Sequence, residues 1–203
     1  MKVLSILANP KTVEQSASLR IERAFHGALA QRRPDAQFEN VDVYRDDIPQ
    51  LDEKVLPAFF GVPPADTETA RKMARREEML KQFMMADVIV IATPMWNFSA
   101  PPMLKAYIDC VLVIGKTFRY TEKGPEGLMK GKRAVLCIAS GGVYEGAMAA
   151  YDHLTPMLRM QLGFIGITDV TEIKAPGQAL GEETAKANTA AAMEKAQAAA
   201  KAI

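Results

Sequence analysis

Short apolar runs alternate with helix-forming segments along the whole chain, and this alternation constrains the fold more than any other feature. Five of these runs predict β-strands, at residues 2–8, 38–44, 87–93, 134–139 and 167–174. Segments in which apolar residues recur at helical spacing follow the strands. Strands that alternate with helices in this way form a parallel sheet with helices covering both of its faces.

The order of these elements predicts an α/β protein with a flavodoxin-like, doubly wound five-stranded parallel sheet and helices on both faces. Two irregular segments, 45–68 and 115–133, interrupt the alternation, and the first is too rich in proline for a long helix. A helix is predicted at 67–85, and another is expected to run unbroken from about residue 147 to 162. Without an internal repeat or a linker, residues 1–203 are expected to form a single domain.

Charge and composition exclude several classes of function. The chain has 203 residues, with 25 basic and 24 acidic side chains and a formal net charge of +1. Nucleic acids and anionic membranes bind clustered positive charge, so we expect neither as a partner. The N-terminal apolar run is too short for a signal peptide and no segment reaches a membrane-spanning length, so we expect a cytoplasmic protein.

The cysteines and histidines do not form the pattern of a metal site. Cys110 and Cys137 lie in apolar surroundings without a metal-binding or CxxC spacing, which predicts buried, reduced thiols. His26 and His153 are isolated on predicted helices, so we expect no bound metal.

The loops after the first, third and fourth strands should meet at one edge of the sheet, where ligands bind in such folds. The first loop lacks both glycine-rich phosphate-binding patterns but carries Asn9, Ser16 and Ser18 near the start of a helix. Hydroxyl groups and free N–H groups at a helix start suit a phosphate dianion. The alternative is that Ser16 or Ser18 serves only as an N-cap.

The second loop is unusual because it contains the only tryptophan of the chain, Trp96, within the run PMWNF at 94–98. An apolar, aromatic wall with one amide group suits a flat heteroaromatic ligand, and packing of Trp96 in the core is the alternative. In the third loop, Gly141 and Gly142 permit a close approach to a ligand or a positive φ, or form an ordinary turn. Together the three loops favour a mononucleotide with a large planar ring, and FMN fits better than a dinucleotide.

Four segments of the chain also resemble a known family. They are SAS at 16–18, TPMWNFSAPPMLKAYID at 93–109, TFRYTEKGPEGLMKGK at 117–132 and GFIGITDV at 163–170. They are similar to segments of the FMN-dependent NADH-azoreductases, which are also described as FMN-dependent NADH:quinone oxidoreductases. The resemblance extends over nearly the whole chain, and it implies a flavodoxin-like homodimer that binds one FMN per subunit.

The resemblance also implies which residues contact FMN. The first loop would hold the phosphate, the second loop the ribityl chain and the ring, and the third loop the edge of the ring. The implied cofactor-binding residues are Asn9, Ser16, Ala17, Ser18, Pro94, Met95, Trp96, Asn97, Phe98, Ala139, Ser140, Gly141 and Gly142. The chain departs from the family at Asn9, at Trp96 and at 139–140, where the family usually has Ser, Tyr and Ser-Arg. The missing arginine removes a charged contact near the ring.

The implied reaction transfers hydride from NADH or NADPH through bound FMN to quinones and azo compounds, in a ping-pong sequence. FMN carries the redox chemistry, so no catalytic acid, base or nucleophile from the protein is expected. The backbone N–H groups of Gly141 and Gly142 and the Asn97 amide are the candidates for stabilising the negative charge of the reduced ring.

The walls of the substrate site are implied to be aromatic and to come partly from a second subunit. Phe60, Tyr120 and Phe164 are the candidates, and each would also suit the core or a dimer interface. A monomer would leave the run PAFFGV at 57–62 exposed, which favours a homodimer.

Three other functions are compatible with an FMN-binding fold. A flavodoxin-type electron carrier generally has a strongly acidic surface that steers its partners, and a net charge of +1 argues against it. An NAD(P)H:FMN reductase would release reduced flavin, so tight retention of FMN would argue against that function. A non-enzymatic ligand-sensing module is the third alternative, because the fold alone does not determine function.

Overall fold

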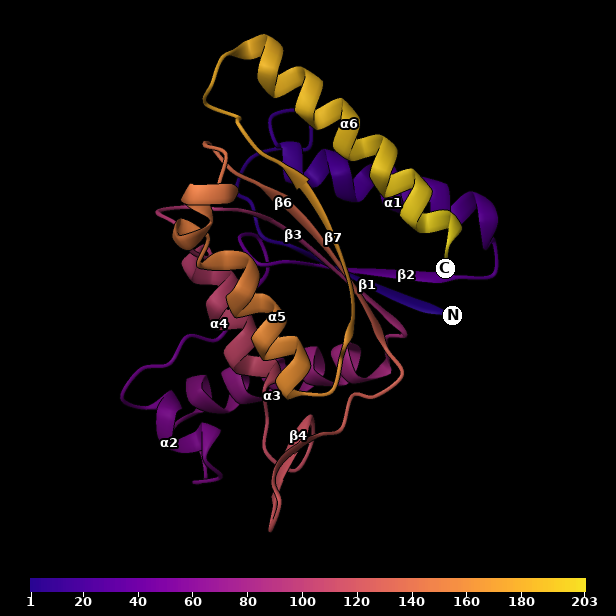
Figure 1. Ribbon diagram of the computed structural model, residues 1–203. Helices are drawn as coiled ribbons and strands as arrows, with labels where there is room; N and C mark the ends of the chain where they lie inside the picture. Colours follow the sequence, from indigo (N-terminus) through magenta and orange to yellow (C-terminus); the bar gives the residue numbers. More distant parts are fainter.

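Five parallel strands form the central sheet of the computed structural model, which describes residues 1–203 (Figure 1). The strands are β1 (Lys2–Leu7), β2 (Gln37–Asp42), β3 (Val88–Pro94), β6 (Arg133–Ala139) and β7 (Asp169–Ala175). Their spatial order is β2-β1-β3-β6-β7, and every neighbouring pair is parallel. The predicted strands and the flavodoxin-like order are confirmed, with boundaries that differ by at most two residues.

Helices cover both faces of the sheet, as the alternation predicted. One face carries α1 (Ala17–Arg32) and α6 (Glu182–Lys201), and the other carries α3 (Thr67–Met85), α4 (Pro102–Val111) and α5 (Leu154–Phe164). Side chains of β3 alternate between the two cores, because successive residues of a strand point to opposite sides. Val88 and Val90 pack with α1 and α6, whereas Ile89 and Ile91 pack with the other helices.

The two cores differ in the size of their side chains. Ala192, Ala196 and Ala200 lie one helical turn apart along α6 and are fully buried against α1 and the sheet. This stripe explains the alanine-rich composition of the last helix, since small side chains allow two helices to pack closely. The opposite core uses larger residues such as Phe83 and Tyr107.

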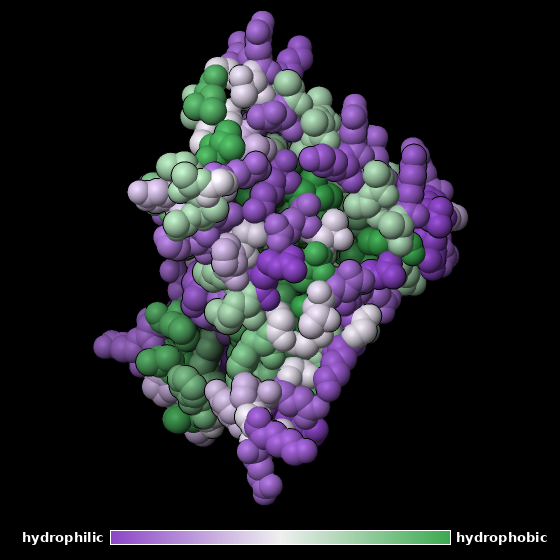
Figure 2. Space-filling model, in the orientation of Figure 1, coloured by the Kyte–Doolittle hydropathy of each residue, from purple (hydrophilic) through white to green (hydrophobic).

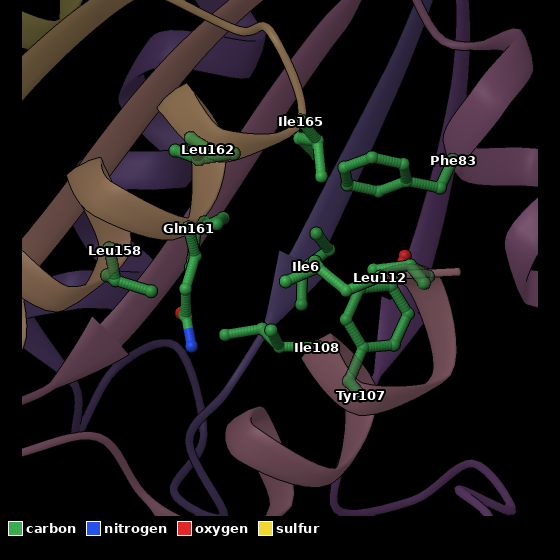
Figure 3. Close-up of a pocket in the computed structure, with 11 residues that line it drawn as sticks. Ile6, Phe83, Tyr107, Ile108, Leu112, Leu158, Gln161, Leu162 and Ile165 are labelled. Atoms are coloured by element: carbon green, nitrogen blue, oxygen red, sulfur yellow. The ribbon is translucent and has the colours of Figure 1, made fainter. Parts of the chain in front are cut away.

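The core beneath α3, α4 and α5 encloses a small apolar cavity of about 20 Å³ (Figure 3). Ile6 of β1, Ile108 of α4 and Leu158 of α5 are among its lining residues. The Tyr107 hydroxyl and Gln161 Oε1 are buried without a hydrogen-bond partner in the protein. A space of this size holds about one water molecule, so the cavity is a packing feature of the core and not a ligand site.

The two irregular segments contain structure that the sequence analysis missed. The first includes the short helix α2 (Val55–Phe59), and the second includes an antiparallel hairpin of β4 (Phe118–Thr121) and β5 (Gly124–Gly127). A side chain at Gly127 would collide with the backbone of Ile165 and Gly166, so the hairpin lies directly against the loop that follows α5. The Met129 N–H donates to Ile165 O at 2.8 Å and fixes the same contact.

The prediction of a single helix at 147–162 is wrong, because the structure has two separate helical segments there. A 3₁₀ turn, η1 (Gly146–Tyr151), precedes α5 and is separated from it by Asp152 and His153. The Asp152 carboxylate accepts hydrogen bonds from the Thr155 N–H at 2.8 Å and from Thr155 Oγ1 at 2.7 Å. Asp152 therefore starts a new helix, because its side chain satisfies a free N–H of the first turn.

Both cysteines are buried and unpaired, as expected. Burial raises the pKa of the Cys110 thiol to about 12 and raises the pKa of the Cys137 thiol well above its usual value. None of the helices combines the length and the apolar character that crossing a bilayer requires.

Candidate functional site

A cleft with a volume of about 380 Å³ opens at the carboxyl edge of the sheet. Loops that follow β1, β3, β6 and β7 form it, as expected for a ligand site in a doubly wound fold. Its lining residues are Asn9, Lys11, Gln15, Ser16, Ala17, Pro94, Met95, Trp96, Ala139, Ser140, Gly141, Gln178 and Ala179. The volume is in the range of small-molecule and cofactor sites.

The loop after β1 forms one end of the cleft through a buried polar network. Asn9 Nδ2 donates to Ser16 Oγ at 2.8 Å, and Asn9 Oδ1 accepts from the Lys11 N–H at 3.0 Å. Ser16 Oγ lies 3.1 Å from Ser18 Oγ and accepts from the Leu19 N–H at 3.3 Å. Ser16 is therefore the N-cap of α1, and the same side chain also lines the cleft.

This end of the cleft keeps several donors unused. The N–H groups of Ala17 and Ser18, in the first turn of α1, have no acceptor in the protein. Lys11 is exposed, forms no ion pair and is the only charged side chain of the lining. Glu14 is exposed and is not part of the lining, so it does not oppose an anion in the cleft. Hydroxyl, N–H and ammonium donors at a helix N-terminus fit a phosphate dianion.

The loop after β3 forms an apolar wall and ends in a strained turn. Met95 and Trp96 line the cleft, and the Met95 N–H donates to Ala139 O at 2.7 Å. Trp96 and Ser99 exchange two backbone hydrogen bonds of 3.0 Å, which close a two-residue turn at Asn97 and Phe98. These two residues have φ of 46° and 69°. The left-handed region is ordinary for asparagine but rare for phenylalanine, so the turn stores strain.

Trp96 is a wall residue and not a core residue, since 38% of its surface is exposed. Tyr44 lies beside it, with the two ring centroids 6.0 Å apart. Burial raises the pKa of the Tyr44 phenol, and its hydroxyl group has no partner in the protein. The pair extends the apolar wall on the side of the cleft next to β2.

The loop after β6 is fixed by the loop after β7. The N–H groups of Gly177, Gln178 and Ala179 donate to the carbonyl groups of Gly142, Ser140 and Gly141, at 3.1, 2.9 and 3.0 Å. The carbonyl groups of the glycine loop are thus occupied, whereas the N–H groups of Gly141 and Gly142 have no acceptor. Neither glycine has a positive φ, and only Gly142 is crowded, since an added Cβ would lie 3.2 Å from Tyr144 Cζ whereas one at Gly141 would meet Ala179 Cβ at 3.5 Å.

The structure places most of the predicted cofactor-binding residues around this cleft. Those that line it are Asn9, Ser16, Ala17, Pro94, Met95, Trp96, Ala139, Ser140 and Gly141. Ser18 lies behind the wall, in contact with Ser16. Asn97, Phe98 and Gly142 do not line the cleft.

Four lining residues were not predicted, namely Lys11, Gln15, Gln178 and Ala179. Lys11 and Gln15 belong to the first loop, whose only cation could have been identified as a phosphate ligand. Gln178 and Ala179 follow the last strand of the sheet. The rule that loops after parallel strands share one edge applies to that strand as well, and it would have found them.

The three predicted substrate-wall residues are not on the cleft of their own chain. Phe60 follows α2 and is 81% exposed, and Tyr120 is exposed on β4. Phe164, at the end of α5, packs on Phe118 with centroids 4.7 Å apart. The hairpin and the end of α5 lie away from the carboxyl edge of the sheet (Figure 1).

Comparisons with known proteins agree with the architecture of this site. A family model described as a flavodoxin-like fold matches residues 1–200. An FMN-dependent NADH:quinone oxidoreductase of Bacillus cereus is 39% identical over 97% of this chain and 96% of its own length. One from Pseudomonas aeruginosa is 43% identical over 89% of this chain and 83% of its own length. The structure of an FMN-dependent NADH-azoreductase from Bacillus anthracis in complex with FMN superposes with a TM-score of 0.91, at 29% identity over 99% of this chain and 98% of that one.

Proposed function

Because the chain belongs to the family of FMN-dependent NADH:quinone oxidoreductases with a flavodoxin-like fold, we propose that it oxidises NADH and reduces quinones and azo compounds with bound FMN. The observation that carries this proposal is the cleft at the carboxyl edge of the sheet, which has anion donors at one end and an apolar, aromatic wall at the other. The chain 1–203 would act as a single FMN-binding unit.

The first loop holds the phosphate of FMN in this proposal. The Ser16 hydroxyl group accepts from Asn9 and Leu19, so its own hydrogen can point either to Ser18 Oγ or to a phosphate oxygen. The free N–H groups of Ala17 and Ser18 add two donors, and Lys11 adds a positive charge. Fixed donors of this kind need no rearrangement when the phosphate binds, which favours tight retention of the cofactor.

The second and third loops hold the ring. Met95 and Trp96 provide the apolar wall, and Gly141 and Gly142 present N–H groups from a backbone that the β7 loop fixes. When bound, FMN supplies the acceptance and donation of hydride. In this proposal the Gly141 N–H, with the neighbouring Gly142 N–H, would stabilise negative charge on the ring, because fixed donors cost no reorganisation during the reaction.

The protein is proposed to be a homodimer whose second subunit completes the substrate site. Exposed hydrophobic side chains gather over α2, at the lower left of Figure 2, and include Leu51, Leu56, Phe60 and Val62. An apolar patch of this kind is typical of an interface. Phe60, Tyr120 and Phe164 do not line the cleft of their own chain, and in the proposed dimer they would contribute to the cleft of the partner.

The proposal is tested by absorbance spectroscopy of the purified protein under anaerobic conditions. We expect a flavin spectrum that survives ultrafiltration, is bleached by NADH and returns when a quinone is added. Survival of the spectrum argues against a reductase that releases its flavin, and turnover with a quinone argues against a simple electron carrier. A protein that neither binds added FMN nor oxidises NADH would refute the proposal.

A further inference from the structure

Three aromatic side chains form a surface next to the cleft without lining it. Phe98 comes from the turn after β3, and Tyr144 and Tyr151 come from the segment between β6 and α5. The Phe98 ring lies 5.9 Å from Tyr144 and 5.6 Å from Tyr151, measured between centroids, at angles of 81° and 44°. We name these three residues the aromatic rim.

The aromatic rim joins the two loops that form the ring end of the cleft. Phe98 is two residues after Trp96, which lines the cleft. The Tyr144 ring folds back over Gly142, where an added Cβ would lie 3.2 Å from Tyr144 Cζ. Through Phe98 and Gly142, the rim therefore adjoins the two loops that carry the lining residues Trp96 and Gly141.

The backbone of the rim is strained at Phe98, and specific hydrogen bonds retain this conformation. Phe98 has a φ of 69°, which is strained for a bulky residue, and the His153 N–H donates to Phe98 O at 3.0 Å. Asp152, next to His153, accepts from Lys174 Nζ at 3.1 Å. Strain that is retained by specific contacts is typical of binding sites. The strain is not offset by burial of the aromatic side chains, since Phe98 is 43% and Tyr151 is 48% exposed.

The chemistry of the rim favours one class of ligand. Exposed aromatic faces bind flat aromatic rings in offset or edge-to-face contacts. The hydroxyl groups of Tyr144 and Tyr151 form no hydrogen bond in the protein, so both can donate to an acceptor oxygen. A planar ring that carries carbonyl oxygens matches both features, and a quinone has this composition.

We propose that the aromatic rim, and Tyr144 and Tyr151 in particular, determines specificity for fused-ring aromatic quinones as electron acceptors. This inference rests on the proposed function and adds the residues that select its substrate. Tyr144 and Tyr151 touch the acceptor in this proposal, whereas His153 and Asp152 are positioning residues that act through the backbone of Phe98 and the start of α5.

The test compares two electron acceptors in the FMN-loaded protein. One is 1,4-naphthoquinone, which is flat and aromatic, and the other is ferricyanide, which is neither. The variants are Tyr144→Phe, Tyr151→Phe and the double variant Tyr144→Ala/Tyr151→Ala. Met160→Ala, which removes a side chain that is 61% exposed on α5, is the matched surface control.

We expect the double alanine variant to lose about tenfold in kcat/KM for naphthoquinone, since it loses two aromatic contacts and two hydroxyl groups. The phenylalanine variants, which lose only a hydroxyl group, should lose about two- to threefold each. The rate with ferricyanide, kcat/KM for NADH and the FMN content should stay within about twofold of the wild type, as in Met160→Ala.

Equal losses with both acceptors, or a loss in kcat/KM for NADH of the same size, would overturn the inference. An unchanged kcat/KM for naphthoquinone in the double variant would overturn it as well. If the oligomeric mass of that variant changed at the same time, the rim would be a subunit interface instead of an acceptor site. A wild-type protein that reduces neither acceptor refutes the proposed function itself. If the wild-type protein reduces both acceptors and the double variant reduces both equally well or equally poorly, only the proposed role of the rim is refuted.

Discussion

The two ends of the cleft differ in how completely they are built. At the phosphate end, Asn9, Ser16 and Ser18 are buried and hydrogen-bonded to one another. At the other end, the lining residue Trp96 is exposed, and the backbone at Phe98, two residues farther along the chain, is strained. A cofactor that stays bound needs fixed donors, whereas substrates that replace one another need an accessible surface. The contrast agrees with the proposal that the first loop retains the cofactor and that the second loop faces exchanging substrates.

Substitution of Ser16 tests the phosphate end and has the largest expected effect. Ser16→Ala should lower the affinity for FMN by about 10- to 100-fold, because a hydrogen bond to a charged group is lost. It should also lower the free energy of unfolding by about 1 kcal/mol, because the N-cap of α1 is lost. Fluorescence titration with FMN and urea unfolding measure the two effects.

Ser16→Asp separates the cap from the ligand contact. Aspartate is a good N-cap, so the free energy of unfolding should stay near the wild-type value. Its carboxylate would face the phosphate, so the affinity for FMN should fall at least as far as in Ser16→Ala. Normal affinity in Ser16→Asp would show that the phosphate is not bound at this end.

The two glycines of the third loop distinguish the cleft from the rim. Gly142→Ala should lower the free energy of unfolding by less than about 1 kcal/mol, because its methyl group would press on the Tyr144 ring at 3.2 Å and this partly buried ring can shift slightly. Gly141→Ala should change it by less than about 0.5 kcal/mol, because its methyl group meets only Ala179, at 3.5 Å. Urea unfolding measures both, and Tyr144→Ala should restore stability to Gly142→Ala but not alter Gly141→Ala.

Substitutions of Asn97 test whether asparagine is needed there for its left-handed backbone conformation or for a contact between its amide and FMN. Asn97→Ala should lower the free energy of unfolding by about 1 kcal/mol, because alanine is strained at a φ of 46°. Asn97→Gly should not lower it, since glycine adopts this conformation freely. Both variants should bind FMN normally, because Asn97 does not line the cleft. Weak FMN binding in Asn97→Gly would instead make the amide a ligand.

The anchor of the rim predicts a small dependence of stability on pH. Burial alone would raise the pKa of Asp152, but hydrogen bonds from Thr155 and Lys174 hold it below its usual value in the folded protein. The unfolded chain therefore takes up a proton first as the pH falls, so the stabilisation is complete above the ordinary aspartate pKa and is lost in acid. Asp152→Asn should be less stable by about 0.5–1 kcal/mol at neutral pH, with a difference that vanishes in acid. A difference that is constant with pH would contradict this assignment.

The central strands β1, β3 and β6 were predictable because each is a nearly continuous apolar run that is buried in the sheet, whereas the edge strands β2 and β7 are half exposed and mix polar with apolar residues. Every residue of β3 is buried, so no polar residue obscured its pattern. The hairpin was not predictable, because β5 is Gly-Pro-Glu-Gly and has no apolar alternation. Its position comes from tertiary contacts with the loop after α5, which no local pattern records.

The site was predictable at the level of loops but not of roles. Ser16 could be placed on the cleft wall because it stands at a helix start after the first strand. The sequence could not show that Asn97 and Phe98 form a left-handed turn next to the cleft, because that depends on two positive φ angles. In contrast, the break before α5 has a local signal, because Asp152 is a capping residue type and its carboxylate accepts from the Thr155 N–H.

The contact between Gly127 and Gly166 has a consequence for association. The backbone of the hairpin packs there directly on the backbone of the loop after α5, without intervening side chains. This contact fixes the orientation of the hairpin and of its exposed tip relative to the sheet. A molecule that docks on this projection meets a surface that is already ordered. Less conformational entropy is then lost on binding, which favours association for a given contact area.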